Sequence, residues 1–299
     1  MDEISVGLST WKTELWLAAR LPASAGTQAW LRDMLTTEVS ALDELASRFR
    51  HDSQLSAVNR AAGRWVQVSW EFIAVLTASL EAAAATDGLV NPLLGTHVVA
   101  AGYDEWADQD SGITAPATTC DWHAIEIKPG QPAAQVRIPL GSALDLGAVA
   151  KGWLADRLAQ IVHASTGADC VANMGGDLRV ISPGEPWVVA ADAGREETHM
   201  ELDDAGLATS GIGHRAWEGG HHIIDPRTGR PAKTAWDSVS VLAGTAAGAN
   251  TASTACIVIG DQGPRWLADK GLDGWFVGPT GERLVGRWQQ LRHVDAARA

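Results

Sequence analysis

The sequence predicts an α+β protein in which mixed or antiparallel sheets pack against helices. Stretches with helical spacing of apolar residues are mixed with short stretches that alternate as strands do. The two kinds follow one another without the regular strand–helix rhythm of a parallel sheet, and no internal repeat is visible. The 299 residues are 46% hydrophobic and 20% charged, which supplies enough apolar side chains for a buried core.

The first part of the chain is expected to contain one alternating segment and two helices. Residues 6–17 alternate as in a strand, and residues 29–49 then carry apolar side chains at helical spacing. Residues 50–60 are polar and are expected to be a loop with short helical turns. A second helix spans residues 71–85 and is ended by the Thr-Asp-Gly that follows it.

The second part begins with residues 104–140, which are rich in acids, prolines and glycines and are expected to form a loop with short strands. This stretch is the only plausible internal seam in a chain that otherwise reads as one domain over residues 1–299. A helix over residues 148–164 ends at Gly167. Further strands are expected at 169–172, 178–181, 187–191, 207–210, 222–224 and 238–243, further helices at 250–259 and 264–270, and a closing hairpin around 278–281.

The charge balance restricts the partners. Acids outnumber Lys and Arg by 36 to 23, giving a net charge of −13 and a pI near 5.0. Nucleic acids and anionic membranes require a basic face, so neither is an expected partner. A small anionic ligand is compatible with this balance if the site is locally built to hold it.

The location expected from the sequence is the cytoplasm. The first residues carry two acids ahead of any apolar stretch, unlike a signal peptide, and no cysteine stands where a lipid anchor would need one. Residues 238–260 are uncharged, but their many Gly, Ser and Thr favour strand, loop and helix over a membrane segment. Cys120, Cys170 and Cys256 are far apart, which fits reduced thiols; one disulfide with a leftover cysteine is the alternative.

Residues 143–157 contain the most informative pattern. Asp145 stands at the expected N-cap of a helix, and Gly147 permits another backbone or a ligand to approach the start of that helix. Lys151 lies in the first turn, where a cation opposes the helix dipole. That position is useful if a phosphate binds there with it. The alternative is a solvated lysine whose stem packs on the helix.

Two further segments have structural explanations of their own. Asn-Met-Gly-Gly-Asp at 173–177 is typical of a tight hairpin turn with free backbone N–H groups. Asp225 precedes a proline and suits the start of a turn. His222 alternates with Ile224 and could be a core histidine. Adjacent histidines in a strand point to opposite faces, so His221 and His222 are not expected to share a metal.

Residues 249–256 place oxygen-bearing side chains on one face of a helix. Asn250 and Thr254 are four residues apart, and Ser253 lies beside them, so the three could ligate a hard cation. The alternative is an Asn N-cap followed by small residues that permit close helix packing.

Taken in order, these segments resemble the ApbE-type FAD:protein FMN transferases. The likeness runs from about residue 5 to residue 260. It is carried by Asp-Leu-Gly-Ala-Val-Ala-Lys-Gly at 145–152, the 173–177 turn, Ala-Thr-Ser-Gly at 208–211, the 222–231 segment and the Ala-x₃-Ser-Thr-Ala-x₂-Val-x-Gly pattern at 249–260. In the front part, residues 49–59, 86–92 and 101–103 look like further segments of the family.

The resemblance implies a T-fold-like α+β architecture and a defined chemistry. Such enzymes bind FAD and a divalent cation, usually Mg²⁺, and transfer FMN to a Thr or Ser of an acceptor protein with release of AMP. Carried over by position, the FAD contacts would be Leu8, Phe49, Ala101, Gly102, Tyr103, Asp145, Lys151 and Ile224. The metal would be held by the Ala148 carbonyl and the side chains of Asn250, Ser253 and Thr254. His222 would be the base that activates the acceptor hydroxyl, and Lys151 would steady the phosphates.

One departure from the family keeps other functions open. Asn250 stands where the family has a metal-binding Asp, so this position brings an oxygen but no charge. Asn91 and Leu93 likewise replace an Asp and a Thr. The alternatives are an FAD-binding carrier or regulator without transfer activity, and an FAD pyrophosphatase that releases FMN and AMP.

Overall fold

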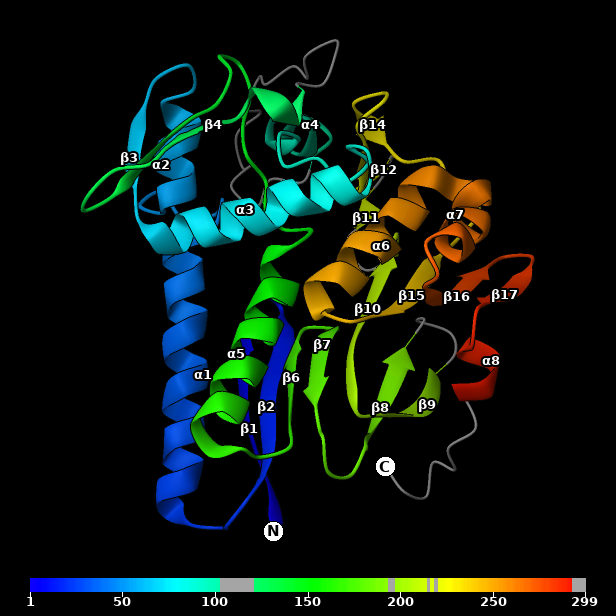
Figure 1. Ribbon diagram of the computed structural model, residues 1–299. Coiled ribbons are helices and arrows are strands. Elements are labelled where there is room, and N and C mark those ends of the chain that lie inside the picture. The colour runs from blue at the N-terminus through cyan, green and yellow to red at the C-terminus, as the bar shows by residue number, and fades with distance from the viewer. Residues whose placement is uncertain (103–120, 193–196, 214–215, 218–219, 292–299) are drawn as a thin grey trace.

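The framework of the molecule is an eight-stranded sheet with the order β1-β2-β6-β7-β10-β15-β16-β17 (Figure 1). The computed structural model describes residues 1–102, 121–192, 197–213, 216–217 and 220–291. All neighbouring strands of the sheet are antiparallel, and with the helices they confirm the α+β class. The strands are β1 (Asp2–Thr10), β2 (Thr13–Leu21), β6 (Cys170–Met174), β7 (Asp177–Ile181), β10 (Asp204–Gly211), β15 (Ser238–Ala243), β16 (Asp273–Gly278) and β17 (Gly281–Val285).

Helices and small sheets surround this framework. The helices are α1 (Ala25–Ala46), α2 (Gln54–Arg60), α3 (Trp70–Ala85), α4 (Gly95–Ala100), α5 (Ala150–Thr166), α6 (Ala246–Ile259), α7 (Gly263–Asp269) and α8 (Trp288–Leu291), with single turns η1 (Trp122–Ala124) and η2 (Gly260–Gln262). The small sheets pair β3 (Val66–Val68), β5 (Ala134–Arg137) and β4 (Glu126–Lys128); β8 (Trp187–Asp192) and β9 (Glu197–Leu202); β11 (Ala216–Trp217) and β12 (Gly220–His221); and β13 (Ile224–Asp225) and β14 (Arg230–Pro231).

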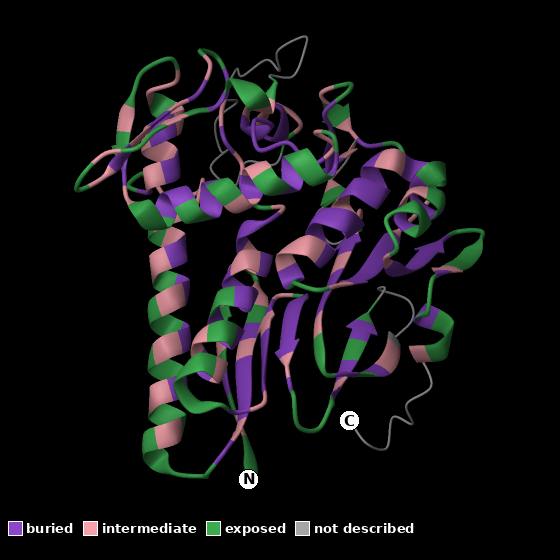
Figure 2. Ribbon diagram, viewed as in Figure 1, coloured by how far each residue is buried: buried purple, intermediate pink, exposed green. Residues whose placement is uncertain are grey.

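Both faces of the central sheet are covered. In β6, Cys170 and Ala172 belong to the core that α1, α3 and α5 complete. Val171, between them, belongs to a second core with the β8–β9 hairpin and Trp288 of α8. This alternation follows from the two-residue period of a strand. Figure 2 shows the result as buried segments along the middle strands and along the faces of α5 and α6 that meet them.

Two glycines allow the elements that carry the candidate site to approach closely. A Cβ on Gly152 of α5 would lie 2.8 Å from the Cα of Ala247 in α6. A Cβ on Gly206 of β10 would lie 2.0 Å from the carbonyl carbon of Thr245, at the start of α6. Neither separation is possible for a real side chain, so small residues set the distances between α5, α6 and the sheet.

Several expected elements take a different form. The first strand is a hairpin whose turn residues Trp11 and Lys12 have φ of 52° and 58°. The expected strand over 222–224 is interrupted at His222 and Ile223. Helix α6 begins at Ala246, not Asn250, because Thr245 caps it by accepting a hydrogen bond from the Gly248 N–H. The helix α4 and the strands β3 and β9 were not predicted, since all are short or lie in segments without a clear period. Strand β4 lies within residues 104–140, where short strands were expected.

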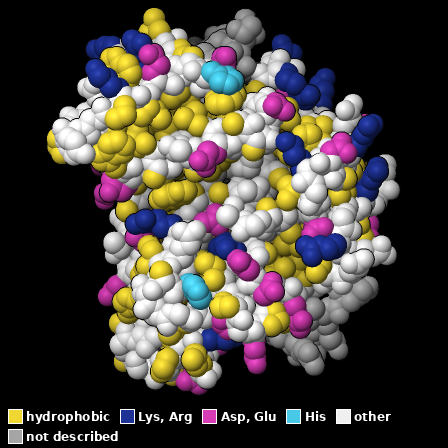
Figure 3. Space-filling view, in the orientation of Figure 1, with side chains coloured by type: hydrophobic (Ala, Val, Ile, Leu, Met, Phe, Trp, Pro, Cys, Tyr) yellow, Lys and Arg dark blue, Asp and Glu magenta, His cyan; other side chains and the backbone are white. Residues whose placement is uncertain are grey.

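The surface facing the viewer in Figure 3 mixes charges of both signs. Lys and Arg side chains lie among Asp and Glu there, and apolar side chains gather over β3 and α3. Trp65 and Trp70, which flank β3, are 37% and 42% exposed. Among the described residues, no helix has both the length and the apolar character that crossing a bilayer requires.

Candidate functional site

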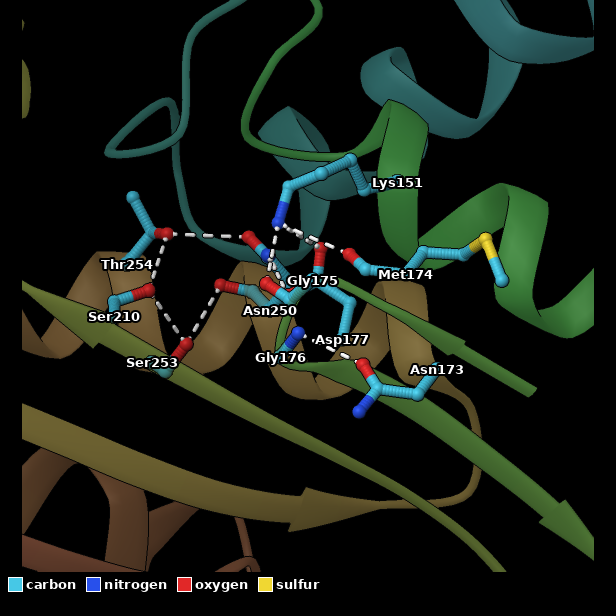
Figure 4. A network of polar contacts seen from close by, with 10 residues as sticks. All are labelled: Lys151, Asn173, Met174, Gly175, Gly176, Asp177, Ser210, Asn250, Ser253 and Thr254. Atoms are coloured by element: carbon cyan, nitrogen blue, oxygen red, sulfur yellow. Dashed lines mark hydrogen bonds and ion pairs between the residues drawn. The ribbon is translucent and has the colours of Figure 1, made fainter. Parts of the chain in front are cut away.

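Lys151 lies at one side of a polar cluster between α5, α6 and the sheet (Figure 4). As the second residue of α5, it reaches the turn between β6 and β7. There its Nζ donates to the carbonyls of Met174 (3.2 Å) and Gly175 (3.0 Å). The same Nζ is 3.3 Å from Oδ2 of Asp177, whose side chain is 2% exposed. The positive charge that the helix dipole disfavours at this end of α5 is therefore balanced by acceptors from the sheet.

Asp177 joins Lys151 to helix α6. Its Oδ1 accepts a hydrogen bond of 2.6 Å from Nδ2 of Asn250, which is itself 7% exposed. An ionised carboxylate strengthens such a bond. Asn250 lies one turn inside α6 and is therefore not the N-cap. Its buried amide instead bonds the helix to β7.

Three hydroxyl groups complete the cluster. Thr254 donates to Oδ1 of Asn250 at 3.3 Å, and Ser253 donates to the Asn250 carbonyl at 3.0 Å. The hydroxyl of Ser210 in β10 lies 2.8 Å from Ser253 Oγ and 2.9 Å from Thr254 Oγ1. These are four contacts, but three hydroxyls have only three protons to donate. One contact must therefore lack a proton, and the 3.3 Å contact is the weakest of the four.

This proton balance fits a hard cation between the Asn250 and Thr254 oxygens that the weakest contact joins. If Asn250 Oδ1 and Thr254 Oγ1 both ligated a cation, Thr254 would donate to Ser210, Ser210 to Ser253, and Ser253 to the Asn250 carbonyl, and all three protons would be used. Side-chain and backbone oxygens are the donors that Mg²⁺ accepts. Within the described residues no three His, Cys, Asp or Glu side chains converge. A metal here would therefore need further oxygen ligands from a bound molecule or water.

A buried carboxylate also positions α6 at its start. Asp156 of α5 accepts from the backbone N–H groups of Ala246 (2.8 Å) and Ala247 (3.0 Å). Burial raises the pKa of this carboxyl, while the two N–H groups and Arg179 oppose that shift. Two backbone N–H groups that have no partner within the helix thereby gain one, which fixes the N-terminus of α6 next to α5.

A second group of predicted residues lies just before α5. Asp145 accepts from the Gly147 N–H at 2.8 Å and forms an ion pair with Arg48 Nε at 3.1 Å. The guanidinium of Arg48 stacks on the ring of Phe49 with its carbon 4.1 Å from the ring centroid. The structure thus brings Asp145 and Phe49 together. Asp145 is not the N-cap of α5, since the helix begins only at Ala150.

The front segments of the chain hold this loop in place. Asn59 accepts from the Leu144 N–H (2.7 Å) and donates to the Leu144 carbonyl (3.0 Å). The Asp145 N–H donates to the Pro92 carbonyl at 2.9 Å. Asp145 and Ala148 line a small cavity together with residues of the 90–92 turn. Ala148 also packs against the cluster that contains Ala255, next to Thr254 on α6.

An apolar group forms the other half of the site. Ile224 packs with Leu94 and Val98 around α4, and Ala101 packs against the same cluster. Gly102, with φ of 99°, has the indole nitrogen of Trp217 only 3.2 Å from where a Cβ would be. Two predicted flavin-contacting segments, 101–102 and 224, are therefore neighbours. Tyr103 lies outside the described residues, and Leu8 packs against the main core and is not part of this cluster.

His221 and His222 have different environments. His221 is 9% exposed, and its Nε2 donates to the Ala232 carbonyl at 3.0 Å while its Nδ1 accepts from the Ile223 N–H. Burial lowers the pKa of His221. His222 is only half-buried and lies in the break between β12 and β13, two residues before Ile224. The two rings thus differ in their surroundings, as expected for neighbours that point to opposite faces.

Asp225 is structural. Its carboxylate accepts three hydrogen bonds of 2.9 Å from the backbone and guanidinium of Arg227. Arg227 in turn donates to the Val258 carbonyl at 2.9 Å, near the end of α6. The turn after Ile224 therefore caps the helix that carries Asn250 and Thr254.

Sequence reasoning missed Asp177 and Ser210 as site residues. Both lie inside segments that were singled out, 173–177 and 208–211, but each of these segments has a bland explanation as a turn or a strand. Strands β7 and β10 are neighbours in the sheet, and α6 packs across both. This packing brings Asp177 to Asn250 and Ser210 to Ser253.

Comparison with known proteins gives a consistent picture. The model of the ApbE family matches residues 9–276. An FAD:protein FMN transferase of Treponema pallidum is 31% identical over 306 residues, covering 91% of this chain and 84% of that protein. One of Salmonella typhimurium is 29% identical over 272 residues, covering 83% and 76%.

Solved structures agree in fold. The ApbE protein of Thermotoga maritima superposes with a TM-score of 0.83 at 22% identity, covering 98% of this chain and all of that one. The flavin transferase ApbE of Vibrio cholerae gives a TM-score of 0.79 at 23% identity, covering 97% and 99%.

Proposed function

The chain belongs to the ApbE family, and from that premise we propose that it is an FAD:protein FMN transferase. In this reaction a hydroxyl of a Thr or Ser on an acceptor protein attacks the FMN phosphorus of FAD, the pyrophosphate bond breaks, and AMP leaves. The observation that carries the proposal is the cluster of Lys151, Asn250, Ser253 and Thr254, which gathers the predicted phosphate and metal residues at one place.

In this proposal Lys151 brings an ammonium group, already paired with Asp177, to the phosphate end of the site. Its ammonium is held by two carbonyls and a carboxylate, so it does not need to be ordered when the ligand binds. The start of α5 adds backbone N–H groups and the positive end of its dipole. Asp145 and Phe49 would bind the flavin side of FAD through the loop before α5.

Mg²⁺ would be held by Asn250 Oδ1, Thr254 Oγ1 and the Ala148 carbonyl, with the remaining ligands from the phosphates and water. Ser253, the fourth predicted ligand, is 0% exposed and is bonded to Ser210 and to the Asn250 carbonyl, so in this proposal it supports the other three ligands instead of binding the ion. When bound, the ion would neutralise charge that develops on the phosphate oxygens. Because position 250 carries no charge, we expect the ion to bind appreciably only together with FAD.

His222 would accept the proton of the acceptor hydroxyl. It is half-buried and lies two residues before Ile224, whereas His221 donates to the Ala232 carbonyl. A base at this position, close to the apolar group that would hold the flavin, suits a hydroxyl that approaches the FMN phosphate from outside.

Two other outcomes remain as alternatives from the same site. Water in place of the acceptor hydroxyl would make the protein an FAD pyrophosphatase that yields FMN and AMP. The neutral Asn250 favours, as the second candidate, an FAD-binding protein in which the metal and the transfer step have been lost.

The test combines the purified protein with FAD and an acceptor peptide that contains a Thr, with and without Mg²⁺. Mass spectrometry of the peptide and chromatography of the nucleotides separate the three functions. An FMN adduct with one AMP per adduct supports the transferase. FMN and AMP without adduct identify the pyrophosphatase, and tight FAD binding without AMP identifies the binding protein.

A cytoplasmic location is also part of the proposal. Cys170 and Cys256 are buried free thiols, and burial raises the pKa of each to about 12, so both are unreactive. Cell fractionation with an antibody against the chain tests the location directly.

A further inference from the structure

Asp177 determines which end of the Asn250 amide faces the candidate metal site. A carboxylate can only accept hydrogen bonds, so the group of Asn250 that lies 2.6 Å from Asp177 Oδ1 must be the NH₂ group. The amide oxygen is thereby forced to the other side, where Thr254 lies at 3.3 Å. In Figure 4, Asp177 and Thr254 lie on opposite sides of the Asn250 amide.

Lys151 lies beside the second oxygen of this carboxylate. Asp177 is 1% exposed, and among the described residues no donor reaches its Oδ2 with hydrogen-bond geometry. The Lys151 ammonium at 3.3 Å balances the charge at that oxygen. An ionised Asp177 therefore has a partner for each oxygen, one a cation and one an amide, and both belong to the predicted site.

We propose that Asp177 is a positioning residue that converts Asn250 into an oxygen ligand. This inference rests on the proposed function for its metal, although the orientation of the amide does not. Without the carboxylate, only the 3.3 Å contact with the Thr254 hydroxyl, which can donate or accept, would distinguish the two ends of the amide. An NH₂ group turned towards Thr254 would repel a cation. The charge of Asp177 also favours a cation nearby, so both effects have the same sign.

The first experiment observes the amide without any ligand. In the free protein, the NH₂ protons of Asn250 should include one that is shifted downfield and exchanges slowly, because a short hydrogen bond to a carboxylate has this signature. The signal is assigned by its loss in Asn250→Asp. In Asp177→Asn the downfield shift should disappear while the thermal midpoint shows that the protein is folded. A downfield signal that is unchanged in Asp177→Asn overturns the proposal.

The second experiment measures Mn²⁺ affinity in the presence of FAD by water-proton relaxation. Asp177→Asn retains a possible hydrogen bond to Asn250 and should weaken Mn²⁺ binding about tenfold or more, the usual effect of losing a residue that orients a metal ligand. The exchange variant Asp177→Asn/Asn250→Asp restores one amide and one carboxylate, with the carboxylate now beside Thr254. Since both ends of a carboxylate are oxygens, it needs no orientation, and the affinity should return to the wild-type value or exceed it.

The outcomes separate this inference from the proposed function. If Mn²⁺ affinity falls equally in the exchange variant and in Asp177→Asn, Asp177 acts through the structure of β7, and this result overturns the positioning role. If wild type binds no Mn²⁺ with FAD, the metal part of the proposed function fails, while the amide signal still decides the orientation. If Asp177→Asn does not fold, the exchange variant carries the test: loss of its Mn²⁺ affinity overturns the proposal, and retained affinity supports it.

Discussion

The two halves of the site are built in different ways. The polar half, around Lys151, Asp177 and Asn250, comes from long elements of the framework, and its groups are bound to one another before any ligand arrives. The apolar half, around Ala101 and Ile224, comes from short helices, two-residue strands and turns that pack on one another.

This difference matches the parts of FAD that each half would bind. Phosphates and a metal require charges at fixed points, and a rigid network provides them without reorganisation. A flavin ring offers broad apolar faces, for which shape and area matter more than direction. We therefore expect changes in the polar half to depend on the phosphates of the ligand and changes in the apolar half to affect all flavins alike.

The largest effect is expected at His222, the proposed base for the acceptor hydroxyl. His222→Ala should lower the rate of FMN transfer about 10²- to 10⁴-fold, the usual contribution of a general base, with FAD affinity nearly unchanged. Adduct formation by mass spectrometry and FAD titration by fluorescence measure the two quantities. His123→Ala is a control, since His123 is exposed and paired with Asp121. Loss of FAD binding in His222→Ala would contradict the role of base.

Lys151→Ala tests the polar half against the apolar one. It should weaken FAD binding by about tenfold or more, and FMN and riboflavin binding progressively less, if the ammonium faces the pyrophosphate as proposed. Ile224→Ala is the matched change in the apolar half and should weaken all three ligands by similar factors. Fluorescence titration with each ligand gives the ratios, and equal losses for the three ligands in Lys151→Ala would exclude a phosphate role.

Asn250→Asp tests whether the polar half tolerates a second carboxylate beside Asp177. A second carboxylate beside Asp177 should destabilise the metal-free protein by about 1–3 kcal/mol, since the favourable hydrogen bond is replaced by repulsion. Mg²⁺ should restore the stability by binding the folded state. Thermal unfolding in EDTA and in Mg²⁺ measures both effects, and a variant equally stable in the two conditions would show that no metal binds here.

The smallest expected effect is on the pH dependence of stability, through His221, three residues before Ile224 of the apolar half. Burial lowers the pKa of His221 below its ordinary value of 6.5, so the unfolded chain binds a proton more readily than the folded one. Its contribution to stability is present above pH 6.5 and is lost as the pH falls towards the folded-state pKa, by at most about 1.4 kcal/mol per pH unit. His221→Gln keeps a donor for Ala232 and should remove this slope in urea unfolding between pH 7 and 5. A slope that persists in His221→Gln would assign it to another group.

The sequence by itself determined the fold class, most of the long elements and the family. The α1, α3 and α5 helices follow from apolar spacing and end signals, which are local properties of the chain. It also indicated that Lys151 would lie in a first helical turn and that Asn250 and Thr254 would share a helix face, because both statements depend only on distances along one helix.

Only the tertiary structure decided what these side chains bind. The start of α6 moved from Asn250 to Ala246 because Thr245 and Asp156 cap it, and Asp156 comes from another helix. Asp177 and Ser210 became site residues because β7 and β10 are neighbours beneath α6, although Asp177 and Asn250 are 73 residues apart in the chain. Hydrogen bonds between distant segments depend on how closely the segments pack and on which donors and acceptors then meet. A local sequence pattern does not determine either.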